Sequence, residues 1–284
     1  MTWGDDPADP WNTQHFLDVA ELTAAFAIGY DWLYDQWTDD QRTSIREAIV
    51  NYGLGYGLNA YTNTSSTYRW WQTVNGNWNC VSNGGLILGS LAILDDDTTG
   101  TASALLQQAV PNAVANCAKV PSSDGTGSET ANYWEFALTG MSELTSSLMT
   151  ATGGGDFGML EANNGVPLTS VFRFYVTGMT SLFDYGDHGP NKYTATGNAL
   201  FFLGTAYNEP RFHLYQRDRY EAPEPWSMFW YDPTVEGAWW NDLPLDHVFD
   251  DPTDTWASFR SSWTDTNGTY ITLKAGALQG HQTQ

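Results

Sequence analysis

Positive charge is scarce in this sequence. Lysine and arginine together number 11 against 33 acidic residues, which gives a formal net charge of −22. Nucleic-acid binding needs clustered lysine and arginine side chains that neutralise phosphates. The composition therefore excludes nucleic acid as a partner, and the surplus of acid indicates a chain that stays soluble in a salty or acidic extracellular medium.

Cysteine and long apolar runs are also scarce. Two cysteines, Cys80 and Cys117, are too few for the disulfide framework of a small secreted domain, and they form either one bridge or two buried thiols. No apolar run reaches the roughly 18 residues that span a membrane, so no membrane partner is expected. The acidic start MTWGDDPADPW is not a signal peptide, whereas glycosylation sequons at Asn63 and Asn267 favour a secreted glycoprotein, extracellular or periplasmic.

The first 222 residues have a helical pattern. Apolar residues recur at helical spacing over 15–37 and over 38–58, and Thr38 with Gln41 forms a capping box at the start of the second segment. Further helical segments follow in pairs of about 50 residues without strict repetition, as in stacked or circularly arranged helical hairpins. We therefore predict an all-α domain over residues 1–222.

The pattern changes after EAPEPW, residues 221–226. Two prolines interrupt the helical spacing, and the segments that follow are short, aromatic and β-branched, with turns such as Asn267-Gly268 between them. These features predict antiparallel strands. Residues 223–284 are assigned to the beginning of an antiparallel β-sandwich domain.

Five stretches carry a family resemblance. They read, in order, FLDVAELTAAFAIGYDWLYD, NWNCVSNGGLILGSLAI, GSETANYWEFAL, FDYGDHGP and FRSSWTDTNGTYITLKAGALQGH. Together they resemble the heparinase II/III-like polysaccharide lyases and span nearly the whole chain. The resemblance implies a mainly α fold, an incomplete α/α toroid of helical hairpins followed by antiparallel sheets, and a chain that is a fragment lacking most of the C-terminal β domain.

Lyases of this family break a uronic acid linkage by β-elimination, which needs a carboxylate neutraliser, a base and an acid. The resemblance places Asn79, and after it Asn77, at the carboxylate-binding position, where amides donate hydrogen bonds without charge; the alternative is that they cap a helix. Tyr133 matches the family's catalytic tyrosine. His188, in a glycine-rich loop, is a second candidate for proton transfer because histidine titrates near neutrality.

Other residues are candidates for substrate binding. An arginine beside two tryptophans suits a sugar subsite with a carboxylate clamp, an acid one helical turn from Tyr133 suits a sugar hydroxyl, and aromatic-rich helices suit a groove. The candidates are Arg69, Trp70, Trp71, Arg173, Glu129 and Tyr30. Core packing, or a carboxylate favoured by the helix dipole, is the structural alternative.

The sequence itself requires no cofactor. The resemblance places His281 at the position of a metal ligand in the family's β domain, and His247 is a second histidine that could join it, so a zinc or calcium ion there is an option. The expected partner is an acidic polysaccharide or oligosaccharide. A plain polyuronate fits better than a heavily sulfated chain because the sequence has so few arginines.

Two other functions remain open. Helical toroids also host glycoside hydrolases, which need two carboxylates across the scissile bond; the candidate acids are Asp31, Asp35, Glu129 and Glu135. Alternatively, the chain is a non-catalytic carbohydrate-binding or structural protein.

Overall fold

A computed structural model describes residues 8–127, 129–183, 185–186, 197–219, 221, 223–253 and 255–276. The chain is mainly helical and ends in a small antiparallel sheet of three strands, which confirms the predicted class and the order of helices before strands. No helix within these ranges has the length and apolarity to cross a membrane.

The chain divides into two compact units. Unit 1 comprises Met1–Ala118 with Glu143–Met159, and unit 2 comprises Lys119–Ser142 with Leu160–Gln284. This division differs from a boundary near residue 222, because the strands belong to the same unit as the helices that precede them.

Unit 1 is helical. Its elements are α1 (Phe16–Trp32), α2 (Asp39–Ala48), a π-helical segment (Ile49–Leu54), α3 (Gly55–Thr62), α4 (Asn77–Ile93), α5 (Thr101–Ala115) and the second half of α6 (Ala131–Thr152). The capping box predicted at the start of α2 is present, since the Thr38 hydroxyl accepts from the Gln41 N–H and the Gln41 side chain accepts from the Thr38 N–H. Pro111 lies inside α5 and does not end it.

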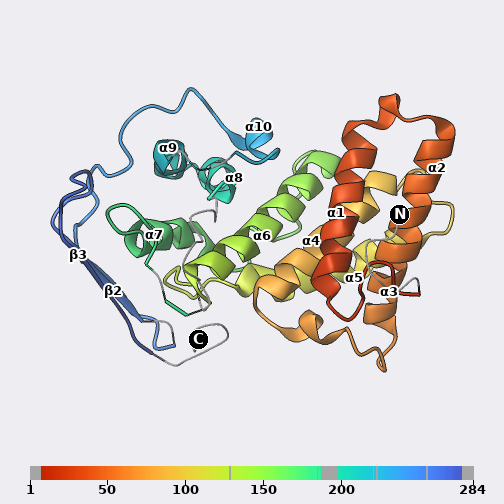
Figure 1. Cartoon of the computed structure of the whole chain (residues 1–284), viewed down its shortest axis with the longest axis horizontal. Helices are drawn as coiled ribbons and strands as arrows, with labels where there is room; N and C mark the ends of the chain where they lie inside the picture. The colour runs from red at the N-terminus through yellow and green to blue at the C-terminus, as the bar shows by residue number, and fades with distance from the viewer. Residues whose placement is uncertain are drawn as a thin grey trace. The chain divides into compact units, whose positions relative to one another are not determined.

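Helices α1 and α4 lie side by side (Figure 1). Gly85 makes this close approach possible, because a Cβ at this position would overlap the backbone of Ala20 on α1. Gly89, one turn further along α4, lies in the same way against the side chain of Thr23. The sequence NGGLILG therefore provides the small residues that let a second helix pack directly on α4.

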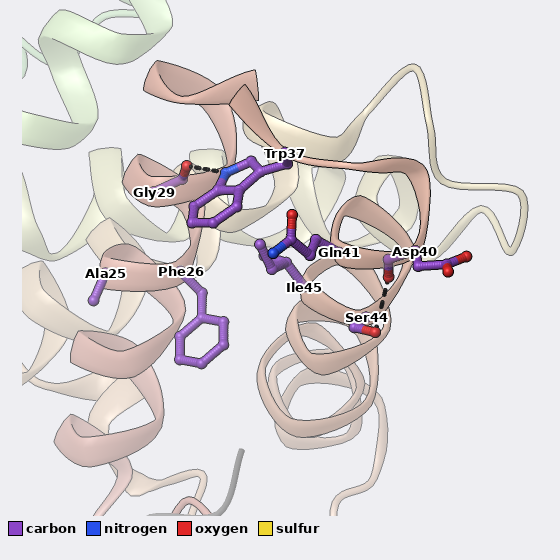
Figure 2. Close-up of a pocket in the computed structure, with 8 residues that line it drawn as sticks. All are labelled: Ala25, Phe26, Gly29, Trp37, Asp40, Gln41, Ser44 and Ile45. Carbon is purple, nitrogen blue, oxygen red and sulfur yellow. Dashed lines mark hydrogen bonds between the residues drawn. The ribbon is translucent and has the colours of Figure 1, made fainter. Parts of the chain in front are cut away.

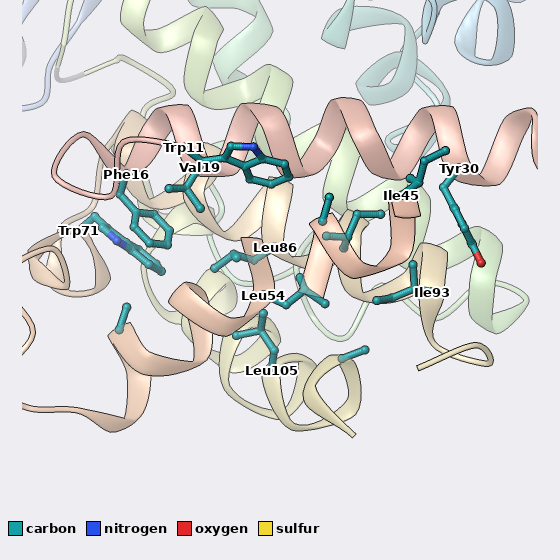
Figure 3. Close-up of a cluster of buried hydrophobic side chains, with 14 residues drawn as sticks. Trp11, Phe16, Val19, Tyr30, Ile45, Leu54, Trp71, Leu86, Ile93 and Leu105 are labelled. Carbon is teal, nitrogen blue, oxygen red and sulfur yellow. The ribbon is translucent and has the colours of Figure 1, made fainter. Parts of the chain in front are cut away.

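The core of unit 1 is rich in aromatic rings (Figure 3). Trp71 is fully buried and stacks on Phe16 with a centroid distance of 5.1 Å. Leu54, Leu86 and Leu105 fill the space between their helices. Much of the aromatic content that suggested a sugar-binding groove thus serves packing, since burying one such ring removes about 150–250 Å² of surface from water.

Unit 2 combines helices with the sheet. It contains the first half of α6, then α7 (Val166–Val176), α8 (Ala199–Ala206), α9 (Pro210–Arg219), the short α10 (Ser227–Trp230), β1 (His247–Phe249), β2 (Trp256–Arg260) and β3 (Tyr270–Lys274). The strand order is β1-β2-β3, and both pairs are antiparallel.

The inner face of the sheet completes the C-terminal end of α7. The hydroxyls of Ser258 and Tyr270 both donate to the carbonyl oxygen of Tyr175, each at 2.7 Å, and Arg260 Nη2 donates to the carbonyl oxygen of Thr177 at 2.8 Å. A helix leaves its last carbonyls without intrahelical partners, so these side chains supply the missing donors. The link explains why strands and helices share one compact unit.

The outer face of the sheet is apolar and open to solvent. Val248, Phe259, Ile271 and Leu273 are 55%, 39%, 54% and 59% exposed. The register places Phe259 opposite Ile271, and Ala257 opposite both Val248 and Leu273. The exposed side chains therefore form one continuous patch across all three strands.

A disulfide joins Cys80 to Cys117, which settles the choice between a bridge and two thiols. Cys80 lies in the first turn of α4, Cys117 follows α5, and both are fully buried. The bridge closes a loop with a sequence separation of 37 residues. It therefore restricts the unfolded chain over the whole α4–α5 hairpin.

We expect the double variant Cys80→Ser, Cys117→Ser to lose about 2–4 kcal/mol of unfolding free energy, because its unfolded chain gains the freedom that the bridge removes. Urea unfolding followed by tryptophan fluorescence measures the loss. A reducing agent should lower the midpoint of the wild type and leave that of the double variant unchanged. Equal midpoints for oxidised and reduced wild type would contradict the prediction.

Candidate functional site

The asparagines at the start of α4 form a buried network of amides. Asn79 is fully buried, and its Nδ2 donates to the carbonyl oxygen of Trp71 at 3.0 Å and to Asn112 Oδ1 at 2.9 Å. Asn83 Nδ2, one turn later, donates to Asn79 Oδ1 and to Asn112 Oδ1, both at 3.0 Å. Three amides from α4 and α5 thus bond to one another.

The network extends outward at two points. Asn112 Nδ2 donates to the carbonyl oxygen of Gln72 at 2.9 Å, and the Tyr61 hydroxyl donates to Asn83 Oδ1 at 2.5 Å. Burial raises the pKa of Tyr61, although its hydrogen bond to Asn83 opposes the shift. The phenol therefore stays neutral and keeps its proton on the network.

This geometry gives Asn79 a structural role. An amide nitrogen has two hydrogens to donate, and both of those on Asn79 go to acceptors inside the protein. A substrate carboxylate would have to displace one of those acceptors. Asn77, the first residue of α4, is also fully buried.

The predicted sugar subsite at Arg69-Trp70-Trp71 has mixed exposure. Trp71 belongs to the core, whereas Trp70 is 47% exposed and lies 4.6 Å from the Trp78 ring centroid. Arg69 is half-buried, and its Nε donates to the carbonyl oxygen of Ala60 at 3.3 Å. Of the three, Trp70 presents the most open ring to a ligand.

Tyr30 is a core residue. Its side chain is fully buried and its hydroxyl donates to Asp96 Oδ2 at 2.6 Å. Burial, together with this hydrogen bond, raises the pKa of Tyr30 to about 12. A groove lined by this ring would require the core to open.

A pocket of about 620 Å³ lies between α1 and α2 in unit 1 (Figure 2). Phe26, Trp37 and Ile45 give it apolar walls, and Asp40, Gln41 and Ser44 line its polar side. The Trp37 indole N–H donates to the carbonyl oxygen of Gly29 at 2.8 Å, which fixes the ring. A flat or apolar group of a ligand fits such a pocket.

Tyr133 lies in the first turn of α6, in unit 2, and is half-buried. Its neighbour Trp134 is buried, and the indole N–H donates to Thr169 Oγ1 at 2.6 Å, which anchors the start of the helix. Glu129, also half-buried, precedes the helix, and its carbonyl oxygen accepts from the Tyr185 hydroxyl at 3.3 Å.

Arg173 is engaged by two carboxylates of the protein. The guanidinium is 1% exposed, with Nη1 2.5 Å from Glu135 Oε2 and Nη2 2.6 Å from Glu221 Oε1. Burial raises the pKa of Glu135 to about 8, although the charge of Arg173 lowers it. The structure therefore assigns Arg173 to an internal ion-pair cluster, and this pairing competes with the predicted substrate contact.

The histidines give no complete metal site in the described part of the chain. His188 and His281 lie outside the described residues. His247 stacks on Tyr175 at 4.6 Å between ring centroids, and burial lowers its pKa. Within the described ranges, no three histidine, cysteine or acidic side chains come together as metal ligands.

Two groupings of residues were not predicted from the sequence, although Gln41, Arg173 and Glu135 were each named there for another reason. The pocket between α1 and α2 brings Trp37 and Gln41 together, and the only local signal for it was the capping box that positions the start of α2. Glu221 and Gln216 join Arg173 and Glu135. The sequence feature that could have indicated this cluster is a charged residue within an apolar helical pattern, as at Glu135 and at Arg173.

The comparisons with known proteins add no relative. No family model matches the chain, and no curated protein matches it. The resemblance to the lyase family therefore stays a prediction.

We expect Asn79→Asp to lower the free energy of unfolding by about 3 kcal/mol, because the carboxylate loses both donors and faces the Trp71 carbonyl and Asn112 Oδ1 as a buried acceptor. The matched control is Asn75→Asp, which introduces the same charge at an exposed position. Urea denaturation compares the two. Equal stability of both variants would show that the Asn79 amide is not committed to the network.

Proposed function

We propose that the chain is a polysaccharide lyase of the heparinase II/III-like type, which cleaves a uronic-acid-containing polysaccharide by β-elimination. In this proposal the helices are part of an incomplete α/α toroid. The order of the five resembling stretches supports it, as does the succession of helices and then antiparallel strands.

One observation carries the proposal. Tyr133 is partly open to solvent and lies in the first turn of α6. Side chains on a helix lean toward its N-terminus, where the helix dipole favours negative charge. In the proposal, the side-chain oxygen of Tyr133 accepts the proton from C5 of a uronate.

The proposed β-elimination accounts for every bond that breaks and forms. Tyr133 takes the C5 proton, the electron pair of that C–H bond forms the C4–C5 double bond, and the C4–O4 bond breaks. The departing O4 receives a proton from the tyrosine, which returns to its initial state. No net oxidation or reduction occurs.

The carboxylate of the substrate needs a neutral or positive donor. The proposal retains Asn79 for this task, with Asn77 as second choice. For Asn79 to act, its amide must exchange the Trp71 carbonyl or Asn112 Oδ1 for the substrate. His188 stays a candidate for proton transfer.

The disulfide supports an extracellular or periplasmic location, because such bonds persist in oxidising compartments. The low number of cations favours a plain polyuronate over a sulfated one. The pocket beside Trp37 provides a place where a sugar ring can stack.

We expect Tyr133→Phe to lower turnover of a polyuronate by at least about 100-fold, because the variant lacks the group that transfers the proton. Oligosaccharide affinity should change little, since the ring remains. The measurement is the ultraviolet absorbance of new unsaturated uronate ends, with a binding isotherm beside it. Tyr231→Phe, at a position that is 42% exposed in the same unit, is the matched control.

Two outcomes would reject the lyase. Unchanged turnover in Tyr133→Phe rules out the proton-transfer role, and oligosaccharide binding without any turnover in the wild type identifies a carbohydrate-binding protein instead.

A hydrolase is the second candidate, favoured by the two carboxylates on Arg173. A carboxyl group whose pKa is raised by burial is typical of a general acid, and burial raises the pKa of Glu135 to about 8. Both acids are at least nine-tenths buried, so a substrate would have to open the cluster. New reducing ends that lack ultraviolet absorbance would favour this reading.

A further inference from the structure

The ion-pair cluster of unit 2 joins one buried arginine to two carboxylates. Arg173 on α7 donates to Glu135 Oε2 of α6 and to Glu221 Oε1, which follows α9. The second oxygen of Glu221 accepts from the Gly197 N–H at 2.7 Å and from Gln216 Nε2 at 3.0 Å. Glu221 is thus satisfied at both oxygens.

Two buried oxygens remain. Glu135 Oε1 and Gln216 Oε1 have no hydrogen-bond partner in the part of the chain that the structure describes. A Cβ on Gly197 would overlap Gln216 Oε1 and lie 3.0 Å from Glu135 Oε1. Both oxygens therefore converge on the same glycine, and both residues are less than 5% exposed.

Exchanging the positions of the Gln216 amide nitrogen and oxygen does not give every acceptor a donor. In the turned orientation Nε2 would face toward Glu135, but Oε1 would face Glu221 Oε2, and two acceptors would again meet. A carboxylate has no hydrogen to donate, whereas a protonated carboxyl group has one, so a hydrogen on a carboxyl group would join such a pair. In either orientation of the amide, two acceptor oxygens face each other while both carboxyl groups are ionised.

We propose that Glu135 is a neutral carboxylic acid in the folded protein and that its O–H group donates to Gln216 Oε1. This hydrogen bond, called the latch below, links α6 to α9 beside Arg173 of α7 and is lost when Glu135 ionises. The structure favours Glu135 over Glu221 because Glu221 already has a donor at each oxygen. Burial, the largest influence on Glu135, also raises its pKa to about 8.

Within the part of the chain that the structure describes, four charged groups act on Glu135. They are Arg173 on α7, Arg219 at the end of α9, and Glu221 and Glu224 in the segment that follows. Arg219 is already near Glu221, with Nε 4.0 Å from Oε1. The loss of the Glu135 proton would therefore add a buried negative charge where Arg173 is already shared.

The direction of the pH effect follows. The pKa of Glu135 rises from 4.5 to about 8 in the folded state. Between those values the folded protein holds a proton that the unfolded chain has released, so the free energy of unfolding falls as pH rises through this interval. The latch is closed at acidic pH and opens as pH passes the folded value.

Glu135→Gln tests the latch. Glutamine keeps a donor for Gln216 Oε1 and cannot ionise, so the variant should lose the pH dependence. From about pH 5 to about pH 9 we expect the melting temperature of the wild type to fall by roughly 5 °C more than that of the variant. Hydrogen exchange of the α7 amides localises the effect to unit 2.

The control is Glu161→Gln, the same change at an exposed position, which should follow the wild type. Equal pH slopes for the wild type and Glu135→Gln would overturn the proposal. Glu21 in unit 1 also has its pKa raised by burial, and the comparison between variants cancels its contribution.

Infrared spectroscopy gives a direct measurement on the wild type. At pH 7 ordinary carboxyl groups are ionised, so the carbonyl stretch of a protonated acid in the wild type should come from Glu135 and disappear above its folded pKa. Loss of that band in Glu135→Gln, with its retention in Glu161→Gln, supports the assignment. Absence of the band in the folded wild type at pH 7 would overturn it.

Discussion

The fold of unit 1 depends on hydrogen-bonding the buried amides of helix α4. This helix is buried along nearly all of its length and yet begins with asparagines. A buried amide without a partner costs about 1–3 kcal/mol, and the helix carries several. Each donor of Asn79 and Asn83 reaches an acceptor on α4, on α5 or in the turn before α4. The disulfide and the contact at Gly85 then hold the neighbouring helices in the position that this network requires.

Unit 2 meets a similar requirement with charge. Arg173 occupies the centre of a buried ion-pair cluster, whereas the network of unit 1 consists of amides. The two glutamates that pair with Arg173 lie on separate segments of the chain. A buried ion pair is stabilising only when further hydrogen bonds satisfy the remaining atoms. Glu221 has hydrogen bonds at both oxygens, whereas Glu135 Oε1 has no partner among the described residues. The proton that we propose on Glu135 would make this part of unit 2 sensitive to pH. Neutral amides in unit 1 carry no such sensitivity to pH.

The local features of the fold can be predicted from the sequence, whereas the long-range pairings cannot. The helices, the capping box at Thr38 and the strands follow from periodicity and turn chemistry, which act over a few residues. The acceptor of the Asn79 amide is Asn112, separated by 33 residues, and the partner of Arg173 is Glu135, separated by 38. Spacing along the chain does not show such pairings. For the same reason the sequence did not distinguish Trp71, which is in the core, from Trp70, which is open to solvent.

The patch on the outer face of the sheet has a consequence for how chains behave toward one another. Its apolar side chains would gain from contact with a second such surface, and a net charge of −22 opposes that contact by repulsion between molecules. Dissolved salt shortens the reach of the repulsion to about 8 Å at 0.15 M, and salts such as sulfate strengthen apolar association. The tendency of the protein to self-associate should therefore depend on ionic strength. Charge repulsion dominates in dilute buffer, and apolar contact between the sheets dominates in concentrated sulfate.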